Sequence, residues 1–537
     1  MTDPLRPADW GEGRPWTLSE IDHETQRFCL EMHKNGIWVN QQRRQQVERV
    51  FTDRWQRREK RLVEVMRTAG MSRGQINDII KDDAPDEDDV EADEKPGSYD
   101  QIRDLLYGPK EANGWDLGIP PGMEEKDFLT SSGLPGTGDK VLRAHLANDW
   151  LQPLQREFIE QLRLYRREKN KVVGTMLLPA SRRDEHKKGL AWEDGRIRSS
   201  WNAHVVANTR LSSSKPNMTN QGSRKGSGIV KSVYEAEPGH ILVGCDLSQA
   251  HLYIAANYWC IKPLQEAFAQ GLDPHVMLAE EVARRGGDDY SKYQGWAEVG
   301  GYSLAKKPAK NSHALALREL CKTMRYTGMY LAGVTLRGGG RYKFVPDTLL
   351  SVVRSTEQVD DDGNSRLPYL KYQSDQVISF HDAWMAREPD WLAAWEWEVR
   401  RFEQRGYATD PIFQRRSGGL SGGKAQEVVN YPILTAEAHI MRLAEWAARQ
   451  AFPFEFAGRA TGVIQQVHDS LIVEIPLPKG FDPLWAPTKD MKAGKEPLPP
   501  ELEKARRTLE ECMSVKIPGW PLSLAADSAV GRTLADT

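Results

Sequence analysis

The stretch ILVGCDLS, residues 241–248, places Asp246 at the end of an apolar run that has the length of a buried β-strand. A second such stretch, VIQQVHDSLIV at residues 463–473, holds Asp469. A carboxylate among residues that favour burial is unfavourable unless its charge is compensated, and a divalent cation with oxygen ligands is one such partner. The two aspartates therefore indicate a shared metal site. The alternative for either one alone is a strand cap that accepts backbone N–H groups.

Between these two strands, residues 318–330 (RELCKTMRYTGMY) predict a helix with a row of functional side chains. At 3.6 residues per turn, four residues fall in one row along the helix: Arg318, Lys322, Tyr326 and Tyr330. Two cations followed by two aromatic rings suit a nucleoside triphosphate, because cations can bind phosphates and rings can cover base and sugar. The alternative is an ordinary amphipathic helix with packed tyrosines and solvated cations.

These motifs resemble, in the same order along the chain, those of the DNA polymerase I family, family A. DLSQAHL at 246–252 is similar to the first palm motif, 318–330 to the O helix of the fingers, and QVHDS at 466–470 to the third motif. TRLSSSKPN at 209–217 resembles the primer–template motif. The resemblance extends over residues 20–537. Looser matches to the helical thumb lie at 31–39, 96–107 and 131–137.

The resemblance implies an α+β, right-hand fold with a helical thumb, an antiparallel palm sheet and helical fingers. The expected parts are an N-terminal tail (1–19), the thumb (20–170), the first part of the palm (171–262), the fingers (263–410) and the second part of the palm (411–537). Within the thumb, the acidic run at about 81–95 has little to bury, so we expect a disordered or mobile insertion there. The glycine-rich residues 417–423 predict a flexible link before a helix at 427–449 that contains Pro432.

The same resemblance implies nucleotidyl transfer at a site with two Mg²⁺ ions, for which Mn²⁺ is a substitute. Asp246, Asp469 and the Leu247 carbonyl would hold the ions, and Lys322 would bind the phosphates and protonate the leaving pyrophosphate. Arg318 and His275 would contact the triphosphate tail. The remaining nucleotide-binding positions are Tyr326, Tyr330, Gln249 and His251. The positions matched to primer or template contacts are Arg210, Asn217, Asn430, Gln466 and His468.

Two of the aromatic positions carry more specific expectations from the resemblance. Tyr330 would pack near the templating position. A tyrosine at position 326 is associated in the family with acceptance of chain-terminating dideoxynucleotides, because its hydroxyl can replace the polar contact of the missing 3′-hydroxyl.

Four positions depart from the usual residues of the family. His251 stands where the first motif usually has Glu beneath the sugar 2′ position, so exclusion of ribonucleotides rests on a different side chain. Ser470 stands where the third motif usually has a second acid, which leaves two carboxylates. Near Asn430, Leu434 and Gln426 replace the usual Gln and Arg.

Composition excludes several other classes of protein. Five cysteines without a Cys-x-x-Cys pair argue against a disulfide framework or a zinc ribbon, and no apolar run is long enough to span a bilayer. We therefore expect a cytoplasmic protein, in the host cytoplasm if the source is viral, with no membrane partner. The net charge of −3 conceals a cation-rich stretch at 163–188 that could follow a duplex backbone, although a solvated helix surface is the alternative.

The expected partners are primer–template DNA and dNTPs. A separate exonuclease or processivity factor is compatible with this prediction. Too few residues precede the first thumb match for a proofreading or a 5′-nuclease domain, so we expect a bare polymerase core such as a phage or a mobile element would carry. Two alternatives stay open. One is a single-subunit RNA polymerase, which the RLSS motif at 210–213 and Tyr326 disfavour. The other is a catalytically silent DNA-binding relative, which the presence of both aspartates and Lys322 disfavours.

Overall fold

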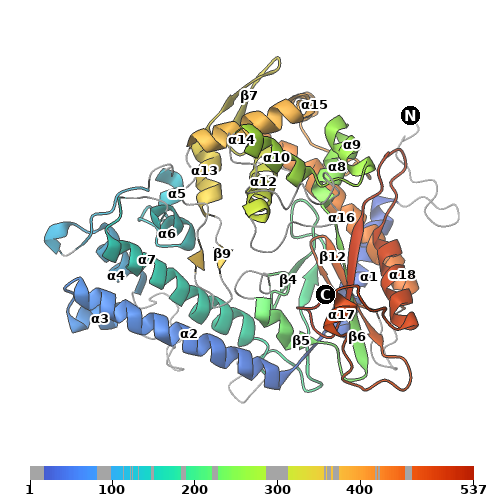
Figure 1. The fold of residues 1–537 in the computed structure, drawn as a ribbon, viewed down its shortest axis with the longest axis horizontal. Coiled ribbons are helices and arrows are strands. Elements are labelled where there is room, and N and C mark those ends of the chain that lie inside the picture. The colour runs from blue at the N-terminus through green and yellow to red at the C-terminus, as the bar shows by residue number, and fades with distance from the viewer. Residues whose placement is uncertain are drawn as a thin grey trace. The chain divides into compact units, whose positions relative to one another are not determined.

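The structure is a computed structural model that combines helices with antiparallel sheets, which confirms the expected α+β class (Figure 1). The acidic run at 81–95 and most of the glycine-rich link lie outside the described residues. The structure describes residues 17–80, 98–112, 114–120, 123, 125–130, 132–146, 150–182, 189–220, 228–285, 313–355, 358–359, 365–366, 374–417, 420, 424–453 and 462–537.

The chain forms two compact units. The first comprises residues 1–45, 176–344 and 378–537, and the second comprises 46–175 and 345–377. The second unit thus groups most of the expected thumb with a segment from the expected fingers. The assignment of thumb, palm and fingers to these residues stays a prediction.

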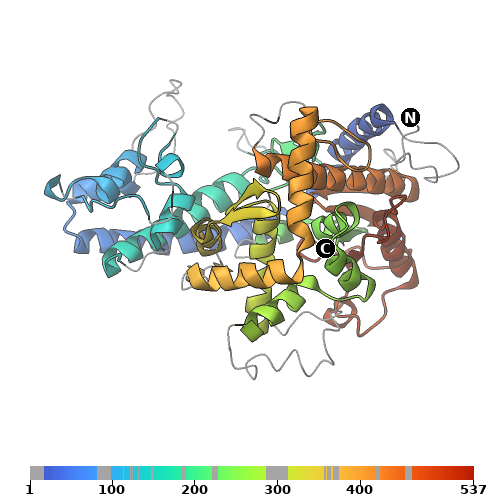
Figure 2. The ribbon, with the colours of Figure 1, turned by 90° about the horizontal axis from the view of Figure 1, so that it is seen from above.

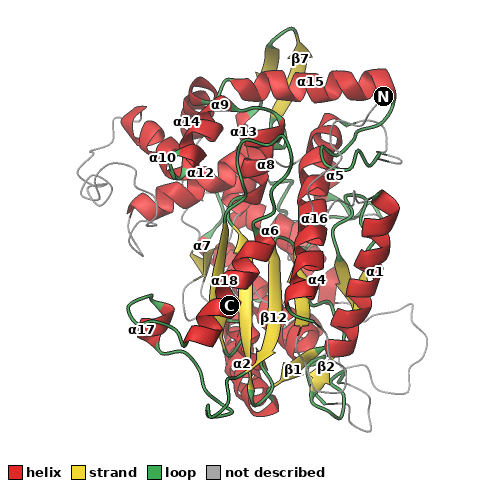
Figure 3. Cartoon of the chain, turned by 90° about the vertical axis from the view of Figure 1, so that its right-hand side faces the viewer, coloured by secondary structure: helices red, strands yellow, loops and turns green. Residues whose placement is uncertain are grey.

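The centre of the first unit is a four-stranded antiparallel sheet in the order β11-β12-β6-β13. In Figure 3, β12 is labelled among the yellow strands. The strands are β6 (His240–Leu247), β11 (Gly462–Val467), β12 (Ser470–Pro476) and β13 (Ala526–Gly531). Successive residues of β6 and β12 are buried, so both faces of these strands are covered. Of the helices around the sheet, α1 (Leu18–Asn35) and α16 (Ala425–Ala451) pack against β11, and α18 (Pro500–Met513) packs against β6 and β13. This double burial explains why these strands read as continuous apolar runs.

Helix α16 confirms the helix expected at 427–449, with Pro432 inside it. It is buried along most of its length and contacts α8 (Ala250–Tyr258) and α15 (Asp390–Arg405). In Figure 2, α15 and α16 are the two orange helices that cross. Because α16 is buried on several sides, polar residues within it require partners from other elements.

The other elements of the first unit are short strands and helices around this core. The strands are β1 (Ile37–Val39), β2 (Arg196–Ile197), β3 (Ser200–Asn202), β4 (Ser212–Ser214), β5 (Tyr234–Glu235), β7 (Val334–Gly338) and β8 (Arg341–Phe344). The helices are α9 (Lys262–Ala269), α10 (Pro274–Arg285), α12 (His313–Met329), α14 (Ser374–Arg387), α17 (Lys489–Lys492) and a 3₁₀ turn (Gly228–Val233). None of the described helices is long and apolar enough to cross a bilayer.

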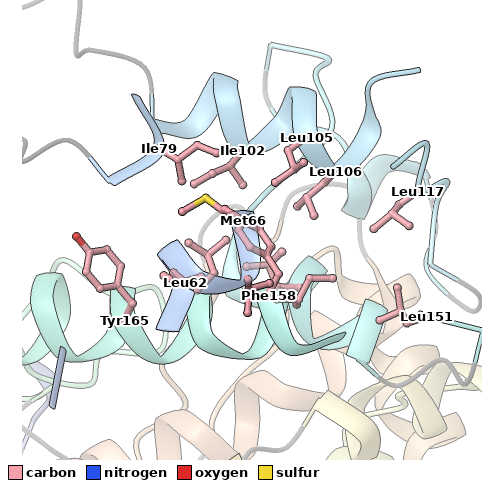
Figure 4. Close-up of a cluster of buried hydrophobic side chains, with 14 of the residues drawn as sticks. Leu62, Met66, Ile79, Ile102, Leu105, Leu106, Leu117, Leu151, Phe158 and Tyr165 are labelled. Carbon is pink, nitrogen blue, oxygen red and sulfur yellow. The ribbon is translucent and has the colours of Figure 1, made fainter. Parts of the chain in front are cut away.

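The second unit is mainly helical and has a hydrophobic core of its own (Figure 4). Phe158 of α7 and Leu62 of α2 are fully buried in it, beside Leu106 of α4. The elements are α2 (Gln41–Thr68), α3 (Arg73–Ile80), α4 (Ser98–Tyr107), a 3₁₀ turn (Lys110–Ala112), α5 (Glu125–Phe128), α6 (Asp139–Leu146), α7 (Pro153–Arg166), a π-helical segment (Arg167–Leu177), α13 (Pro346–Ser355), β9 (Gln358–Val359) and β10 (Ser365–Arg366).

Part of the cation-rich stretch at 163–188 is engaged inside this second unit. Arg163 is buried and donates to the Asp139 carboxylate at 2.8 Å, and Arg166 donates to the Thr137 carbonyl at 2.6 Å. These two guanidiniums therefore tie α7 to residues at the start of α6. A role of the stretch along a duplex backbone stays a prediction and would rest on its other cations.

Helix α12 is anchored in the first unit by a buried ion pair. Arg325, with no exposed surface, donates to Glu388, whose other carboxylate oxygen accepts from the indole N–H groups of Trp384 (2.9 Å) and Trp391 (2.8 Å). Trp395 donates to the Met329 carbonyl at 3.0 Å. This network fixes α12 against α14 and α15.

We expect Glu388→Gln to lower the free energy of unfolding by about 3 kcal/mol or more, because it leaves the buried Arg325 charge without its counter-ion. Denaturant unfolding followed by tryptophan fluorescence measures this change. Glu403→Gln, at an exposed position of α15, is the matched control and should stay within about 0.5 kcal/mol of the parent. Equal stability of the two variants would show that the ion pair does not hold α12.

Candidate active site

The sheet brings the two aspartates of the sequence analysis together. Asp246 on β6 pairs in register with Ser470 on β12, the residue directly after Asp469. The Leu247 N–H donates to the Asp469 carbonyl at 2.9 Å. Residues more than 220 positions apart in the chain therefore meet at one end of two neighbouring strands, which is the arrangement that a shared site requires.

The Asp469 carboxylate lies in a buried and negatively charged environment. Burial raises the pKa of Asp469 to about 6, and the negative charges of Glu437 and Asp246 contribute to this rise. Within the described part of the chain, no group of three or more His, Cys, Asp or Glu side chains forms a metal-binding cluster. A divalent ion here would rely on two carboxylates with backbone oxygens, a donor set of oxygen atoms only, which fits Mg²⁺.

Backbone strain lies on both sides of this carboxylate pair. His468, in the turn between β11 and β12, has φ of 53°, and Gln249, just before α8, also has φ of 53°. Non-glycine residues in this left-handed region persist where surrounding structure holds them, often at functional sites. The Gln466 amide donates to the His468 carbonyl, at 2.5 Å, and so helps to hold the turn.

Helix α12 carries the expected row, but its first member is engaged with α10. Arg318 is 4% exposed and donates through Nε (2.8 Å) and Nη2 (2.6 Å) to the Asp273 carboxylate. His275 is fully buried, and its Nδ1 lies 3.2 Å from Arg325 Nη1. Burial lowers the pKa of His275 well below its usual value, so the ring is neutral at pH 7. Both side chains are therefore committed to contacts between α10 and α12 in this structure.

Tyr326, the third member of the row, lies within the electrostatic influence of Asp469. Lys322 and Tyr326 are half-buried, and burial raises the pKa of the Tyr326 hydroxyl, with a further contribution from the Asp469 charge. The Tyr326 ring packs against the rings of His275 (5.4 Å) and His251 (5.8 Å). The structure thus brings one end of α12 beside the strand ends that carry the aspartates.

Tyr330 and His251 belong to a polar cluster that includes a residue the sequence analysis missed. The Tyr330 hydroxyl lies 2.9 Å from His251 Nδ1, and His251 Nε2 contacts the Glu437 carboxylate of α16. Arg210 donates to the same carboxylate oxygen. Burial alone would raise the pKa of Glu437, but its contacts with His251 and Arg210 lower that pKa to about 2, so the carboxylate is ionised.

Glu437 left one signal in the sequence. It stands between the apolar residues Ile433, Leu434, Ala436 and Ala438, where a charge requires a buried partner. Its partner could not be identified from these residues themselves. A second unpredicted carboxylate is Asp527 on β13, which lies opposite Asp246 in the sheet and accepts from the Ser248 hydroxyl at 2.5 Å.

Three of the expected nucleotide or DNA contacts present buried acceptors. Among the residues that the structure describes, the side-chain oxygens of Gln249, Asn430 and Gln466 are buried without a hydrogen-bond partner. Buried acceptors of this kind are normally satisfied by water or a ligand. Asn217 differs, because its side-chain oxygen accepts from the Thr219 hydroxyl at 2.8 Å and orders the turn after β4.

Comparisons with known proteins find similarity to DNA polymerases. The profile of DNA polymerase family A matches residues 95–294. The DNA polymerase I of Chloroflexus aurantiacus is 26% identical over 290 residues, which cover 52% of this chain and 25% of the relative. The DNA polymerase I of Pseudomonas aeruginosa is 25% identical over 389 residues, which cover 71% of this chain and 34% of the relative. The chain therefore spans between a quarter and a third of the length of these relatives.

A solved structure matches most of the chain. The POL domain of Pol1 from M. smegmatis, in complex with DNA primer-template and dNTP, matches with a TM-score of 0.62 and 18% sequence identity. The match covers 96% of this chain and 70% of that chain. This likeness confirms the expected fold.

Proposed function

We propose that this chain, which is related to the family A DNA polymerases, is a template-directed DNA polymerase that adds dNTPs to the 3′-hydroxyl of a primer. The observation that carries the proposal is the junction of Asp246 and Asp469 beside α12. The Leu247 N–H to Asp469 carbonyl bond joins the two aspartate segments, and the Asp469 charge acts on the Tyr326 hydroxyl. These contacts support the proposal that the groups assigned to the metal ions and those assigned to the nucleotide act together.

Each part of the site has a role in this reaction. Two divalent ions held by Asp246, Asp469 and the Leu247 carbonyl would make the primer hydroxyl a better nucleophile and neutralise the triphosphate. Lys322 would bind the phosphates and donate a proton to the leaving pyrophosphate. The Tyr326 ring would lie over the incoming nucleotide, and Tyr330 would pack near the templating position. Arg318 and His275 would contact the triphosphate tail. To reach a phosphate, Arg318 would have to break its contact with Asp273.

The DNA-facing side of the site consists of polar groups without sequence preference. Asn430 and Gln466 have buried side-chain oxygens that can accept from minor-groove edges, sugars or bound water. Gln249, one of the expected nucleotide-binding positions, has a buried side-chain oxygen of the same kind. Arg210, Asn217 and His468 complete the set of expected primer or template contacts. We further propose the assignment of thumb, palm and fingers given by the resemblance, with any proofreading or processivity factor supplied by a separate protein.

Primer extension tests the proposal. A labelled primer annealed to a longer template, with Mg²⁺ and either dNTPs or rNTPs, should be extended with dNTPs in the order that the template dictates. Extension with rNTPs alone would support an RNA polymerase, and tight DNA binding without extension would support a silent relative. The same preparation without dNTPs should leave a mismatched primer intact; steady shortening that survives Asp246→Ala would reveal a nuclease site.

Tyr326→Phe should discriminate against dideoxynucleotides at least about tenfold more strongly than the parent, because it removes the hydroxyl that can stand in for the missing 3′-hydroxyl contact. Single-nucleotide incorporation of ddNTP and dNTP measures the ratio. Tyr342→Phe, on β8, is the matched control and should keep the parent ratio. Equal ddNTP use by parent and Tyr326→Phe would place Tyr326 away from the sugar.

A further inference from the structure

Four side chains from four separate segments form one chain of polar contacts beside the carboxylates. Tyr330 follows α12, His251 is in the first turn of α8, Glu437 is in the middle of α16, and Arg210 precedes β4. The contacts run from the Tyr330 hydroxyl to His251 Nδ1 and from His251 Nε2 to Glu437, to which Arg210 also donates. Glu437 is 1% exposed, so it does not itself touch a bound nucleotide.

Glu437 is the anion that allows Arg210 and His251 to lie close together. Arg210 Nη2 and His251 Nε2 lie 2.8 Å apart, and both contact the same oxygen of Glu437. Two donors approach each other this closely because they share one ionised acceptor. Without the carboxylate, a guanidinium and an imidazole N–H would face each other with no acceptor between them.

The Glu437 carboxylate also determines whether His251 Nδ1 donates or accepts the hydrogen bond with Tyr330. The proton on one imidazole nitrogen is set by the hydrogen bond that the other nitrogen makes. With Nε2–H donated to Glu437, Nδ1 of a neutral ring accepts from the Tyr330 hydroxyl. The orientation of both rings therefore depends on a residue of α16 that lies behind them.

We propose that Glu437 is a positioning residue for sugar selection, which holds the His251–Tyr330 pair in the place where a 2′-hydroxyl would be excluded. The inference rests on the proposed function, since His251 occupies the position beneath the sugar that the resemblance assigns. The acid that the family usually carries at position 251 is here supplied from α16, and the imidazole lies between that acid and Tyr330. Specificity of this kind depends on sterics and on polar groups held without alternative partners.

The test is the ratio of kcat/KM for a dNTP to that for the matching rNTP, measured on one preparation. This ratio does not depend on the fraction of active protein, so partial misfolding does not change it. Glu437→Gln should lower the ratio at least about tenfold, with most of the change in rNTP incorporation, and His251→Ala should lower it by a similar factor. Glu445→Gln is the matched control, because Glu445 is also buried on α16 but does not contact His251, and it should keep the parent ratio.

A rescue variant separates positioning from general packing. The double variant Glu437→Gln with His251→Glu returns a carboxylate to the space beside Arg210 and Tyr330, and it should restore the ratio to within about threefold of the parent. An unchanged ratio in Glu437→Gln, or a double variant no more selective than Glu437→Gln, would overturn the inference. Failure of the parent to extend a primer with dNTPs would instead overturn the proposed function.

Discussion

Primer extension by Asp469→Asn is expected to fall by roughly a thousandfold or more, with primer–template affinity within a few-fold of the parent. Removing a ligand of the catalytic ions forfeits several kcal/mol of transition-state charge stabilisation, and about 4 kcal/mol corresponds to a factor of about 10³. Because we propose that this carboxylate holds the metal ions and does not contact the duplex, we expect the affinity for primer–template to change little. Single-turnover extension and fluorescence anisotropy with labelled DNA measure the two quantities.

The same variant should stabilise the metal-free protein. The pKa of Asp469 is raised to about 6, so folding disfavours its ionised form. The unfolded chain releases this proton near its ordinary pKa of 3.8, and the free energy of unfolding therefore decreases as pH rises from about 4 to about 6 and remains lower above that. Asp469→Asn removes this penalty, which is of order 1 kcal/mol at pH 7.5 after allowance for partial exposure.

Thermal unfolding in EDTA and in Mg²⁺ checks the stability effect. In EDTA the variant should unfold at a higher temperature than the parent, and Mg²⁺ should raise the midpoint of the parent more than that of the variant. Asp53→Asn, at an exposed position of α2, is the control and should match the parent in both solutions and in extension. A variant that retained a tenth of the parent turnover would contradict the assignment of Asp469 as a metal ligand.

Lys322→Ala should reduce the rate of nucleotide incorporation about 10²–10³-fold, because it removes a cation proposed to bind the phosphates and to donate a proton. Of the two cations in the α12 row, Lys322 is the one that lies one turn from Tyr326. Its charge also acts on the buried His275, which places it at the α10–α12 contact. Pre-steady-state incorporation of a single dNTP measures the effect. Lys343→Ala, an exposed lysine on β8, should remain within about twofold of the parent.

Lys322→Arg distinguishes the two roles given to this side chain. Arginine keeps the positive charge but does not release a proton at accessible pH. We therefore expect Lys322→Arg to recover most of the apparent dNTP affinity while the maximal rate stays at least about tenfold below the parent. A maximal rate equal to that of the parent would exclude proton donation by Lys322, and a Lys322→Ala rate within tenfold would exclude both roles.

Local features were predictable from the sequence because short-range periodicity and local chemistry determine them. The apolar run of 241–248 becomes β6, the four-residue spacing of Lys322 and Tyr326 places them on one face of α12, and α16 forms despite Pro432 because its residues are apolar on several sides. The α+β class follows from such elements. The meeting of Asp246 and Asp469 was expected because two buried carboxylates suit one shared metal site, and the resemblance supported it, but no local rule shows that β6 pairs with β12.

The tertiary structure alone decided which charged groups are paired. Arg210 and Glu437 are 227 residues apart in the chain, and no local pattern connects them. In the same way, Arg318 was predicted as a phosphate contact, whereas in the folded chain it donates to Asp273. The physical reason is that a buried charge requires an opposite charge or a hydrogen-bond partner, and the segment that provides it depends on how distant elements pack. The sequence by itself determined which side chains are available for the proposed chemistry, and the packing of α8, α12 and α16 decided how they are held.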